Sequence, residues 1–370
     1  EVGHALGFGH NFAASVSDRA SVMDYPAPWV IAGPDGTLDF AQAYDTGIGE
    51  WDEITARWLY GDYDPATEEA DLDAVVAGAQ DEGLLYISDE HGRSVGTMHP
   101  LAAVWDNGAD PVAELDNVMA VRRIALDHFG EQALAEGRSL SALREVFVPV
   151  WLYHRYQLAA AAKTLGGAYY AYGKRGADAA SVAMTTPEEQ RRALAAILTT
   201  ISPDALTLTE TQLDLMEPAT DPYWFRVPGE TLESRAGPAF DATAAVETAA
   251  GLTFAALFHP ARAERLVQFH ARDTENPSLE EVFDAVDDVV FAATANEREA
   301  ETMRIVRGRY VFALMQLGDS NASQLVKAQV RAQLAALERR LGLFGRLPQG
   351  GAAHDAWLAA RIKAWLDRPA

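Results

Sequence analysis

Three features are scarce or missing in this chain of 370 residues, and each absence excludes a class of protein. Cysteine is absent, which excludes disulfide bonds and thiol chemistry and is compatible with either the cytosol or an exported location. No stretch approaches about 18 uninterrupted apolar residues, so we expect no membrane-spanning helix. Basic residues number 30 against 54 acidic ones, and the net charge of −24 would repel both nucleic acid and anionic membranes.

The rest of the composition is that of a globular protein. Hydrophobic residues make up 49% of the chain and charged residues 23%, which are ordinary values for folded domains. The length suggests about two domains with ample material for a hydrophobic core. Composition alone does not indicate a function, whereas sequence motifs can.

The first ten residues, E-V-G-H-A-L-G-F-G-H, form the strongest motif. Glu1, His4, Gly7 and His10 occupy their positions in the pattern H-E-x-x-H-x-x-G-x-x-H, which is typical of a catalytic zinc helix. The first histidine of that pattern would stand immediately before Glu1. A lone E-x-x-H on an amphipathic helix usually carries no site, but the longer pattern is far more specific.

Each position of the motif has a physical reason. On a helix, residues four apart share one face, so His4 and the preceding histidine would reach the same Zn²⁺ ion. Glu1 would lie beside the metal without ligating it and act as general base toward the water that attacks the substrate. Gly7 would end the helix, with a positive φ if needed, and bring His10 back as the third nitrogen ligand. Three protein ligands leave the fourth position of a catalytic zinc open.

The segment Ser21–Tyr25 (S-V-M-D-Y) predicts a methionine-containing turn beneath this site. Met23 would form an apolar floor under the ligands, because its flexible thioether fills irregular gaps. The hydroxyl of Tyr25 would point at the zinc or at the developing oxyanion, or Tyr25 would simply be a packing residue. The small and polar residues of Asn11–Ala20 predict a surface loop before the turn.

Two further segments follow the turn. Trp51, Ile54, Trp58 and Leu59 are spaced as on a helix, so Glu50–Tyr60 predicts a helix that closes the catalytic domain and packs against the zinc helix. Residues 61–82 are acidic and indicate a solvated connector. The segments Leu84–Ser88 and Ser94–Thr97 predict a hairpin around Asp89–Gly92, and Gly33–Gly36 predicts a turn between short extended pieces.

Asp106-Asn107-Gly108-Ala109-Asp110 has two interpretations. Its oxygen-bearing side chains would suit a calcium ion, but the string lacks the spacing and the terminal glutamate of a recognised calcium loop. A tight turn before a helix is the simpler interpretation.

From residue 112 onward the chain predicts helix after helix. Thr186-Pro187 and Ser278-Leu279 are typical helix starts, each followed by acidic residues. Pro149 would kink a helix over Ser141–Leu165. Further helices are predicted over Ala242–Phe258, Ala261–Arg272 and Glu297–Leu317, and an apolar stripe near the C-terminus is followed by Gly342 as a stop (Val326, Val330, Leu334, Leu337 and Leu341). None of the other histidines has a second ligand at metal spacing, and His154 is best explained as a core residue.

These elements predict a mainly α fold: the C-terminal part of a zincin-like catalytic domain (1–60), a connector with a short β-hairpin (61–111), and an α-helical region (112–370). On Glu1–His10 and Ser21–Tyr25 the chain resembles the metzincin zinc proteases, and more closely the large bacterial zinc-dependent metalloproteases with a Met-zincin domain. The stretches Gly47–Asp52 and Trp105–Pro111 are also similar to that family. Asn11, where many metzincins carry an acidic residue or serine, departs from the wider pattern.

The resemblance implies a zinc metalloendopeptidase that hydrolyses peptide bonds in an exported bacterial protein, with His4 and His10 as zinc ligands and Glu1 as base. It also implies that an N-terminal part of the same polypeptide, carrying the first zinc histidine and a substrate-aligning sheet, precedes Glu1. We therefore expect residues 1–370 alone to be poorly active or inactive. The alternative is a helical binding or scaffold module with a degenerate, non-catalytic zinc motif.

Overall fold

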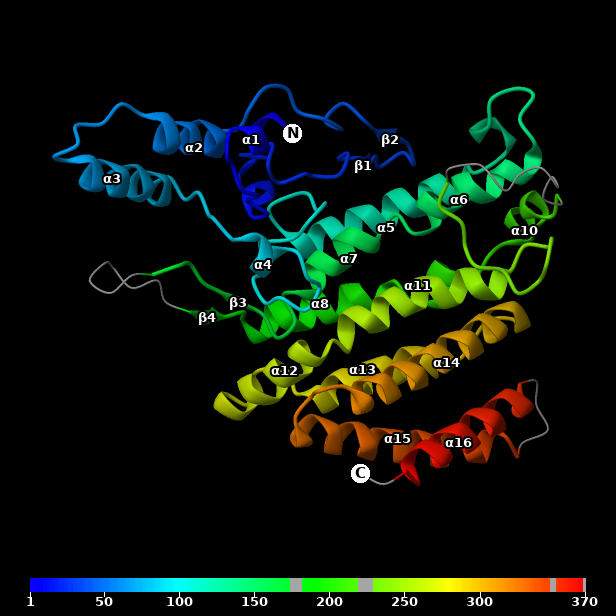
Figure 1. Cartoon of the computed structure of the whole chain (residues 1–370). Coiled ribbons are helices and arrows are strands. Elements are labelled where there is room, and N and C mark those ends of the chain that lie inside the picture. The colour runs from blue at the N-terminus through cyan, green and yellow to red at the C-terminus, as the bar shows by residue number, and fades with distance from the viewer. Residues whose placement is uncertain (174–181, 219–228, 347–350, 369–370) are drawn as a thin grey trace. The chain divides into compact units, whose positions relative to one another are not determined.

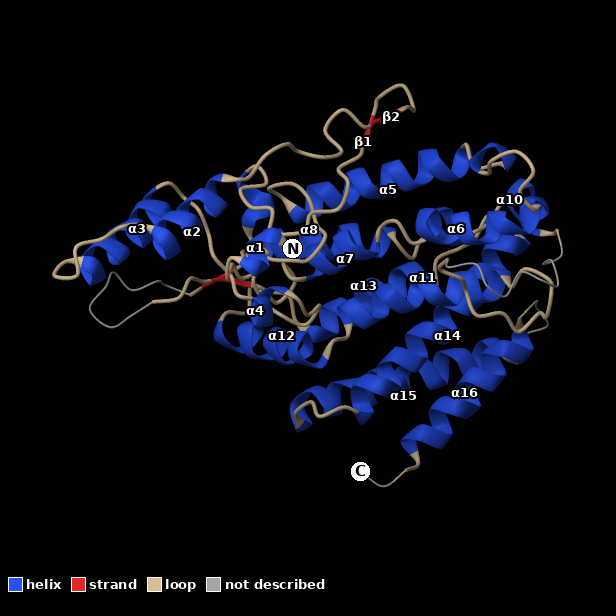
Figure 2. Cartoon of the chain, turned by 45° about the horizontal axis from the view of Figure 1, so that its top comes forward, coloured by secondary structure: helices blue, strands red, loops and turns tan. Residues whose placement is uncertain are grey.

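The computed structural model describes residues 1–173, 182–218, 229–346 and 351–368. Helices dominate these ranges, and the described strands form two short antiparallel pairs (Figure 2). The mainly α fold with a small β component is therefore confirmed. Within the described ranges, no helix is long and apolar enough to cross a membrane.

The chain forms two compact units, each made of two stretches of sequence. Unit 1 comprises Glu1–Val121 and Tyr156–Ala193, and unit 2 comprises Arg122–Arg155 and Leu194–Ala370. The α-helices and strands described in unit 1 are α1 (Val2–Ala5), β1 (Ile31–Ala32), β2 (Leu38–Asp39), α2 (Glu50–Tyr60), α3 (Glu68–Asp81), α4 (Asp89–Gly92), α5 (Pro111–Asp127), α7 (Arg155–Ala162), β3 (Ala168–Tyr169), β4 (Ala183–Met184) and α8 (Pro187–Thr199). Three of these helices, α5, α7 and α8, have ranges that cross a boundary between the two units.

The helix α2 has the bounds that the sequence predicts, and α3 packs beside it (Figure 1). Residues 61–82 are mostly exposed, as expected of a solvated connector, and α3 occupies most of that range. Its acidic first turn suits a helix N-terminus, and one apolar face of α3 reaches the core. The core here joins distant segments through Ala14, Ala20, Ile54, Ala79 and Leu84.

The strands β1 and β2 pair in antiparallel register, with Ala32 opposite Leu38, around the turn predicted at Gly33–Gly36. Gly36 has a φ of +79°, which explains the glycine at that position. The hairpin predicted around Asp89–Gly92 is wrong, because this segment forms the short helix α4 after Ser88. A serine followed by two acidic residues is typical of a helix start, and this local preference prevails over a hairpin turn.

The described part of unit 2 is mainly helical and includes two 3₁₀ turns. Its helices in chain order are α6 (Leu143–Trp151), α9 (Pro203–Leu206), α10 (Glu210–Met216), α11 (Ala242–Leu257), α12 (Pro260–Arg272), α13 (Leu279–Val290), α14 (Glu297–Asp319), α15 (Gln324–Phe344) and α16 (Ala352–Leu366). The helices α14, α15 and α16 lie side by side, and α11 runs along α14 (Figure 1).

Several predicted helix signals in unit 2 are confirmed. Ser278 caps α13 by accepting a hydrogen bond from the Glu281 amide at 3.0 Å. The apolar stripe predicted near the C-terminus is buried on α15, where Val326, Val330 and Leu334 are fully shielded from solvent. The helix does not stop at Gly342 but continues to Phe344.

The segment 141–165 forms two helices and not one kinked helix. Pro149 lies inside α6, which ends at Trp151, and α7 begins at Arg155. Because proline cannot donate the hydrogen bond that an interior residue contributes, the helix is weakened there and ends within the next turn. His154 therefore lies in the break between the two helices.

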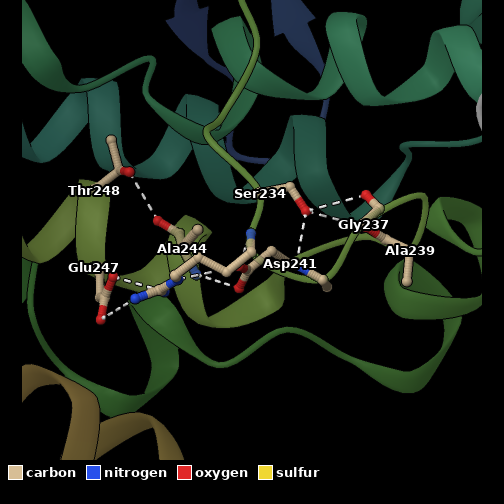
Figure 3. Close-up of polar contacts among 9 residues, drawn as sticks. Ser234, Gly237, Ala239, Asp241, Ala244, Glu247 and Thr248 are labelled. Carbon is tan, nitrogen blue, oxygen red and sulfur yellow. Dashed lines mark hydrogen bonds and ion pairs between the residues drawn. The ribbon is translucent and has the colours of Figure 1, made fainter.

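Asp241 joins the start of α11 to the loop before it (Figure 3). Its carboxylate accepts a hydrogen bond from the Ala244 amide at 2.8 Å and one from the Arg235 amide at 2.9 Å. The Arg235 side chain also pairs with Glu247 on α11 at 2.8 Å, and Ser234 bonds carbonyls of the same loop. A single carboxylate thus fixes both the helix start and the loop that leads into it.

His154 is a core residue, as predicted, with no solvent-exposed surface and no hydrogen bond to either ring nitrogen. Burial, together with the nearby charges of Arg122 and Arg155, lowers the pKa of His154 to about 3. In the unfolded chain a histidine takes up its proton below about pH 6.5. The unfolded state therefore binds more protons between these two values, and the free energy of unfolding must fall as the pH falls below 6.5.

We predict that His154→Phe removes this acid sensitivity. Each pH unit below 6.5 should cost the wild-type protein about 1.4 kcal/mol through this residue, and the variant should lack that loss. Urea unfolding of unit 2 between pH 4 and 7 measures the difference. His128→Phe is the matched control, because His128 is exposed at the end of α5 and should leave the slope unchanged. Equal slopes for His154→Phe and wild type would contradict the assignment.

Candidate metal centre

The N-terminal motif forms a short helix that ends where the sequence predicts. The helix α1 stops at Leu6, and Gly7 follows with a φ of +87°. The Gly7 amide donates to the His4 carbonyl and the Phe8 amide to the Gly3 carbonyl, which is the hydrogen-bond pattern of a Schellman C-cap. A side chain at Gly7 would be strained at this φ, so glycine is what allows the chain to reverse here.

This reversal brings His4 and His10 together. Their ring centroids are 4.7 Å apart and the ring planes are nearly perpendicular. Nδ1 of His4 donates a hydrogen bond to the Phe8 carbonyl at 3.1 Å, and Nδ1 of His10 donates to the Asp89 carboxylate at 3.2 Å. Because Nδ1 carries the proton in each ring, Nε2 is the nitrogen that offers a lone pair.

The two rings fit a shared zinc ion. Two imidazoles that ligate one tetrahedral zinc through Nε2 place their ring centres about 5 Å apart, close to the observed separation. Within the described ranges, no group of three or more His, Cys, Asp or Glu side chains is arranged to hold a metal ion. The described residues thus offer a pair of nitrogen ligands.

The two candidate catalytic residues, Tyr25 and Glu1, differ in their contacts. The Tyr25 hydroxyl donates to Nε2 of His4 at 2.9 Å, and 36% of the Tyr25 side chain is exposed. Tyr25 is therefore at the edge of the candidate centre and not packed into the core. Glu1 is exposed, and its backbone carbonyl accepts the Ala5 amide in the first turn of the helix.

Met23 lies beneath the helix. It is 2% exposed, and a Cβ atom added to Gly3 would stand only 2.4 Å from the Met23 sulfur. The missing side chain at Gly3 is therefore what lets the thioether approach the backbone of α1. Met23 is therefore an apolar support under the helix that carries His4.

Asp52, on α2, holds the methionine turn. Its buried carboxylate accepts hydrogen bonds from the Ser21 hydroxyl at 2.6 Å, the Val22 amide at 2.8 Å and the Gly49 amide at 2.9 Å. Gly49 allows the close contact, because a Cβ there would meet the Ala20 carbonyl oxygen at 2.0 Å. The Tyr60 hydroxyl at the end of α2 donates to the Leu6 carbonyl, just after α1, at 2.6 Å, whereas the buried Ile54 of α2 packs with Ala14, Ala20 and Ala79.

The segment after His10 is buried, so the surface loop predicted from Asn11 onward is wrong for its first five residues. Asn11 donates to the Leu85 carbonyl at 2.9 Å and accepts from the amides of Ala13 and Ile87. Phe12 stacks on the His10 ring at a centroid distance of 4.8 Å. The small and polar residues of this segment predict exposure. The segment is buried instead, because the Asn11 side-chain amide bonds backbone groups that would otherwise be buried without partners.

Asp89 is a site residue that the sequence did not reveal. It begins α4, binds His10, and forms a second pair with Arg93 at 2.9 Å. Partial burial tends to raise the pKa of Asp89, but the hydrogen bonds from Arg93 and His10 outweigh it and lower the pKa. Asp89 therefore stays ionised and fixes the orientation and tautomer of the histidine.

Asp52 and Asp89 were missed for different reasons. An acidic residue three positions after Gly49 is a detectable helix-capping signal, but it does not reveal that the same carboxylate reaches Ser21 and Val22. No local signal connects Asp89 with His10. Of the weaker histidine candidates, His99 is 2% exposed, and burial and the charge of Lys163 lower its pKa to about 4.

A glycine-ended helix that carries one imidazole, with a second imidazole on the reversed segment after it and a buried methionine turn beneath, is the arrangement of a zincin-like domain. The family model for Met-zincin matches residues 1–298, and the chain belongs to this family. No curated protein and no solved structure matches the chain. The family supports a zinc metallopeptidase-like domain, in agreement with the resemblance carried by the two motifs.

We predict that Asp52→Ala lowers the free energy of unfolding by roughly 2–4 kcal/mol, because it leaves the buried Ser21 hydroxyl and two partly buried amide donors without their acceptor. Chemical unfolding of unit 1 measures this loss. Glu53→Ala is the matched control on the same helix, and since Glu53 is exposed its cost should stay within about 0.5 kcal/mol. Similar losses for the two variants would show that the turn does not depend on Asp52.

We predict that Asp89→Asn weakens zinc binding about 10–100-fold, because His10 loses the carboxylate that orients it. A zinc titration against a chromophoric chelator measures the change in Kd. Glu90→Gln, at the exposed neighbouring position, should leave the Kd unchanged. An unaltered Kd for Asp89→Asn, or an equal change in both variants, would rule out the orienting role.

Proposed function

We propose that this chain carries the catalytic centre of a zinc-dependent endopeptidase, with His4 and His10 as two of its three zinc ligands. The observation that carries the proposal is the paired imidazole geometry, in which an acceptor engages Nδ1 of each ring and leaves Nε2 as the ligating nitrogen. The Met-zincin family supports the same reaction class. The third ligand corresponds to the motif position before Glu1.

In this proposal His4, His10 and the third ligand would hold a zinc ion, which would supply Lewis acidity toward the scissile carbonyl and the attacking water. Glu1 accepts the proton from that water and returns it to the leaving amine. Tyr25 donates its hydroxyl hydrogen bond to the oxyanion in place of His4. Asp89 keeps His10 in the tautomer and orientation that binding requires.

The substrate in this proposal is a peptide or protein, and the protein acts outside the bacterial cytoplasm, as the family resemblance implies. The high negative charge of the chain disfavours nucleic acid as a partner. A scaffold function remains the competing hypothesis, and it differs from the proposal in one measurable respect. A scaffold would show no peptide hydrolysis even when all three ligands are provided.

We predict that residues 1–370 bind less than one zinc per chain and leave casein intact. The same chain preceded by a helical segment that ends in the motif histidine should bind one zinc and cleave casein, because three nitrogen ligands then define the site. Metal analysis and a casein assay measure the two properties. Cleavage of casein by residues 1–370 alone would contradict the ligand assignment.

In the three-histidine version, Glu1→Gln should retain zinc and lower kcat by roughly 100-fold or more, because the general base is lost while the ligands remain. Glu50→Gln is a suitable control, since Glu50 is exposed at the start of α2. Normal turnover in a zinc-loaded Glu1→Gln protein would remove Glu1 from its proposed role.

A further inference from the structure

A second cluster of polar groups lies in unit 1 and has no part in the centre described above. Asp24 belongs to the methionine turn, and Asp106 belongs to the string 106–110 that precedes α5. Asp24 has no exposed surface and Asp106 is 1% exposed. Ser15 lies between the two chain segments and donates its hydroxyl to Asp106 at 3.4 Å.

The carboxylate of Asp24 is unsatisfied. Neither of its oxygens has a hydrogen-bond partner in the described part of the chain. The amide and hydroxyl of Ser15 are nevertheless close enough to lower the pKa of Asp24, against the effect of burial, which raises it. Burying an ionised carboxylate without hydrogen-bond partners costs free energy of folding, so we expect a compensating positive charge near it. Among the described residues, those that shift the pKa of Asp24 are the acid Asp106, which repels its charge, and Ser15.

Asn107 presents a second buried oxygen without a partner. Its side chain is 6% exposed, and its amide nitrogen donates to the Ala27 carbonyl at 3.0 Å. Because only the nitrogen of the amide can donate to a carbonyl, this bond fixes which end is the oxygen. That oxygen, Oδ1, accepts no hydrogen bond from any described residue.

The buried charges do not balance. Burial and the charge of Asp106 raise the pKa of Asp24 to about 9, and burial raises that of Asp106 to about 7 against the opposing effect of Lys163. Glu114 adds another acidic group near Asp106. Lys163 is the basic group that acts on Asp106, and its ammonium group donates to the carbonyls of Gly92 and Ala102. The three carboxylates, if ionised, exceed the one ammonium by two negative charges.

We propose that Asp24, Asp106 and the side-chain oxygen of Asn107 bind a calcium ion beneath the methionine turn, with the Ser15 hydroxyl beside it. All these donors are hard oxygen atoms, which suit Ca²⁺ and not the nitrogen-preferring zinc. Ca²⁺ also tolerates irregular ligand geometry, whereas Mg²⁺ requires a near-ideal octahedron and keeps several waters, which a buried site disfavours.

The ion would act on the turn that the catalytic centre uses. Asp24 lies between Met23, which supports α1, and Tyr25, which has a left-handed φ of +58°. Trp105, the neighbour of Asp106, also has a left-handed φ, of +63°. A bound Ca²⁺ would hold both segments by their carboxylates and so stabilise unit 1 without contacting the two histidines.

The test is Ca²⁺ titration of the full chain after chelator treatment and desalting. We expect one Ca²⁺ per chain by calorimetry, and a rise in the Tm of unit 1 of about 5 °C at a concentration 100-fold above Kd. Terbium, a luminescent substitute for Ca²⁺, should be sensitised by tryptophan, since Trp105 adjoins Asp106. No binding and no Tm shift with millimolar Ca²⁺ would overturn the proposal.

Asp24→Asn should abolish the Ca²⁺-dependent rise in Tm while leaving the ion-free protein at least as stable, because a buried charge is removed. Asp106→Asn should do the same and serves if the first variant does not fold. Asp45→Asn, at an exposed acidic position of unit 1, should respond to Ca²⁺ like the wild type. A full response in both buried-acid variants, or an equal response of the wild type to Mg²⁺, would overturn the calcium assignment.

Discussion

The contact between Asp52 and the methionine turn is the constraint on which the candidate centre depends. Three donors from two chain segments converge on one buried carboxylate, and such charge-assisted hydrogen bonds are strong and directional. They fix Ser21 and Val22 against α2, and Met23 and Tyr25 follow in the positions that support and border His4. A shift of this turn would move the floor of the site and its tyrosine together.

The helix α1, which carries His4, contributes little to its own position. The helix α1 has four residues, none of them buried, so it is too short to be stable by itself. Its neighbours hold it instead: Met23 beneath Gly3, Tyr60 at the Leu6 carbonyl, and Asp89 at His10. The arrangement of His4 and His10 is therefore imposed from outside the helix, by segments that come later in the chain.

The buried acids of unit 1 fall into two kinds with opposite physical roles. Asp52 has a donor for each of its oxygens, so burial strengthens its hydrogen bonds and makes it a structural anchor. Asp24 and Asp106 are buried with few donors, and for them the same low dielectric raises the pKa. The satisfied carboxylate of Asp52 thus holds the methionine turn in shape, while Asp24 on that turn and Asp106 before α5 would be stabilised by a cation.

The sequence by itself determined the features whose causes lie within a few residues. The bounds of α2, the Ser278 cap, the α15 stripe and the helix end at Gly7 follow from helical spacing, capping and backbone preference, which act locally. The chemically specific spacing of Glu1, His4 and His10 likewise indicated the family before any fold was known.

Only the tertiary structure decided the burial of Asn11, the helix at Asp89–Gly92, and the pairing of Asp89 with His10. Asp89 and His10 are separated by 79 residues, and Asn11 and Leu85 by 74. Whether such groups meet depends on how every intervening segment packs, because each long-range contact must offset the entropy of closing the chain between its partners. Local sequence rules carry no information on that balance, so the candidate ligands His4 and His10 could be named from the sequence, while Asp89, which hydrogen-bonds His10, could not.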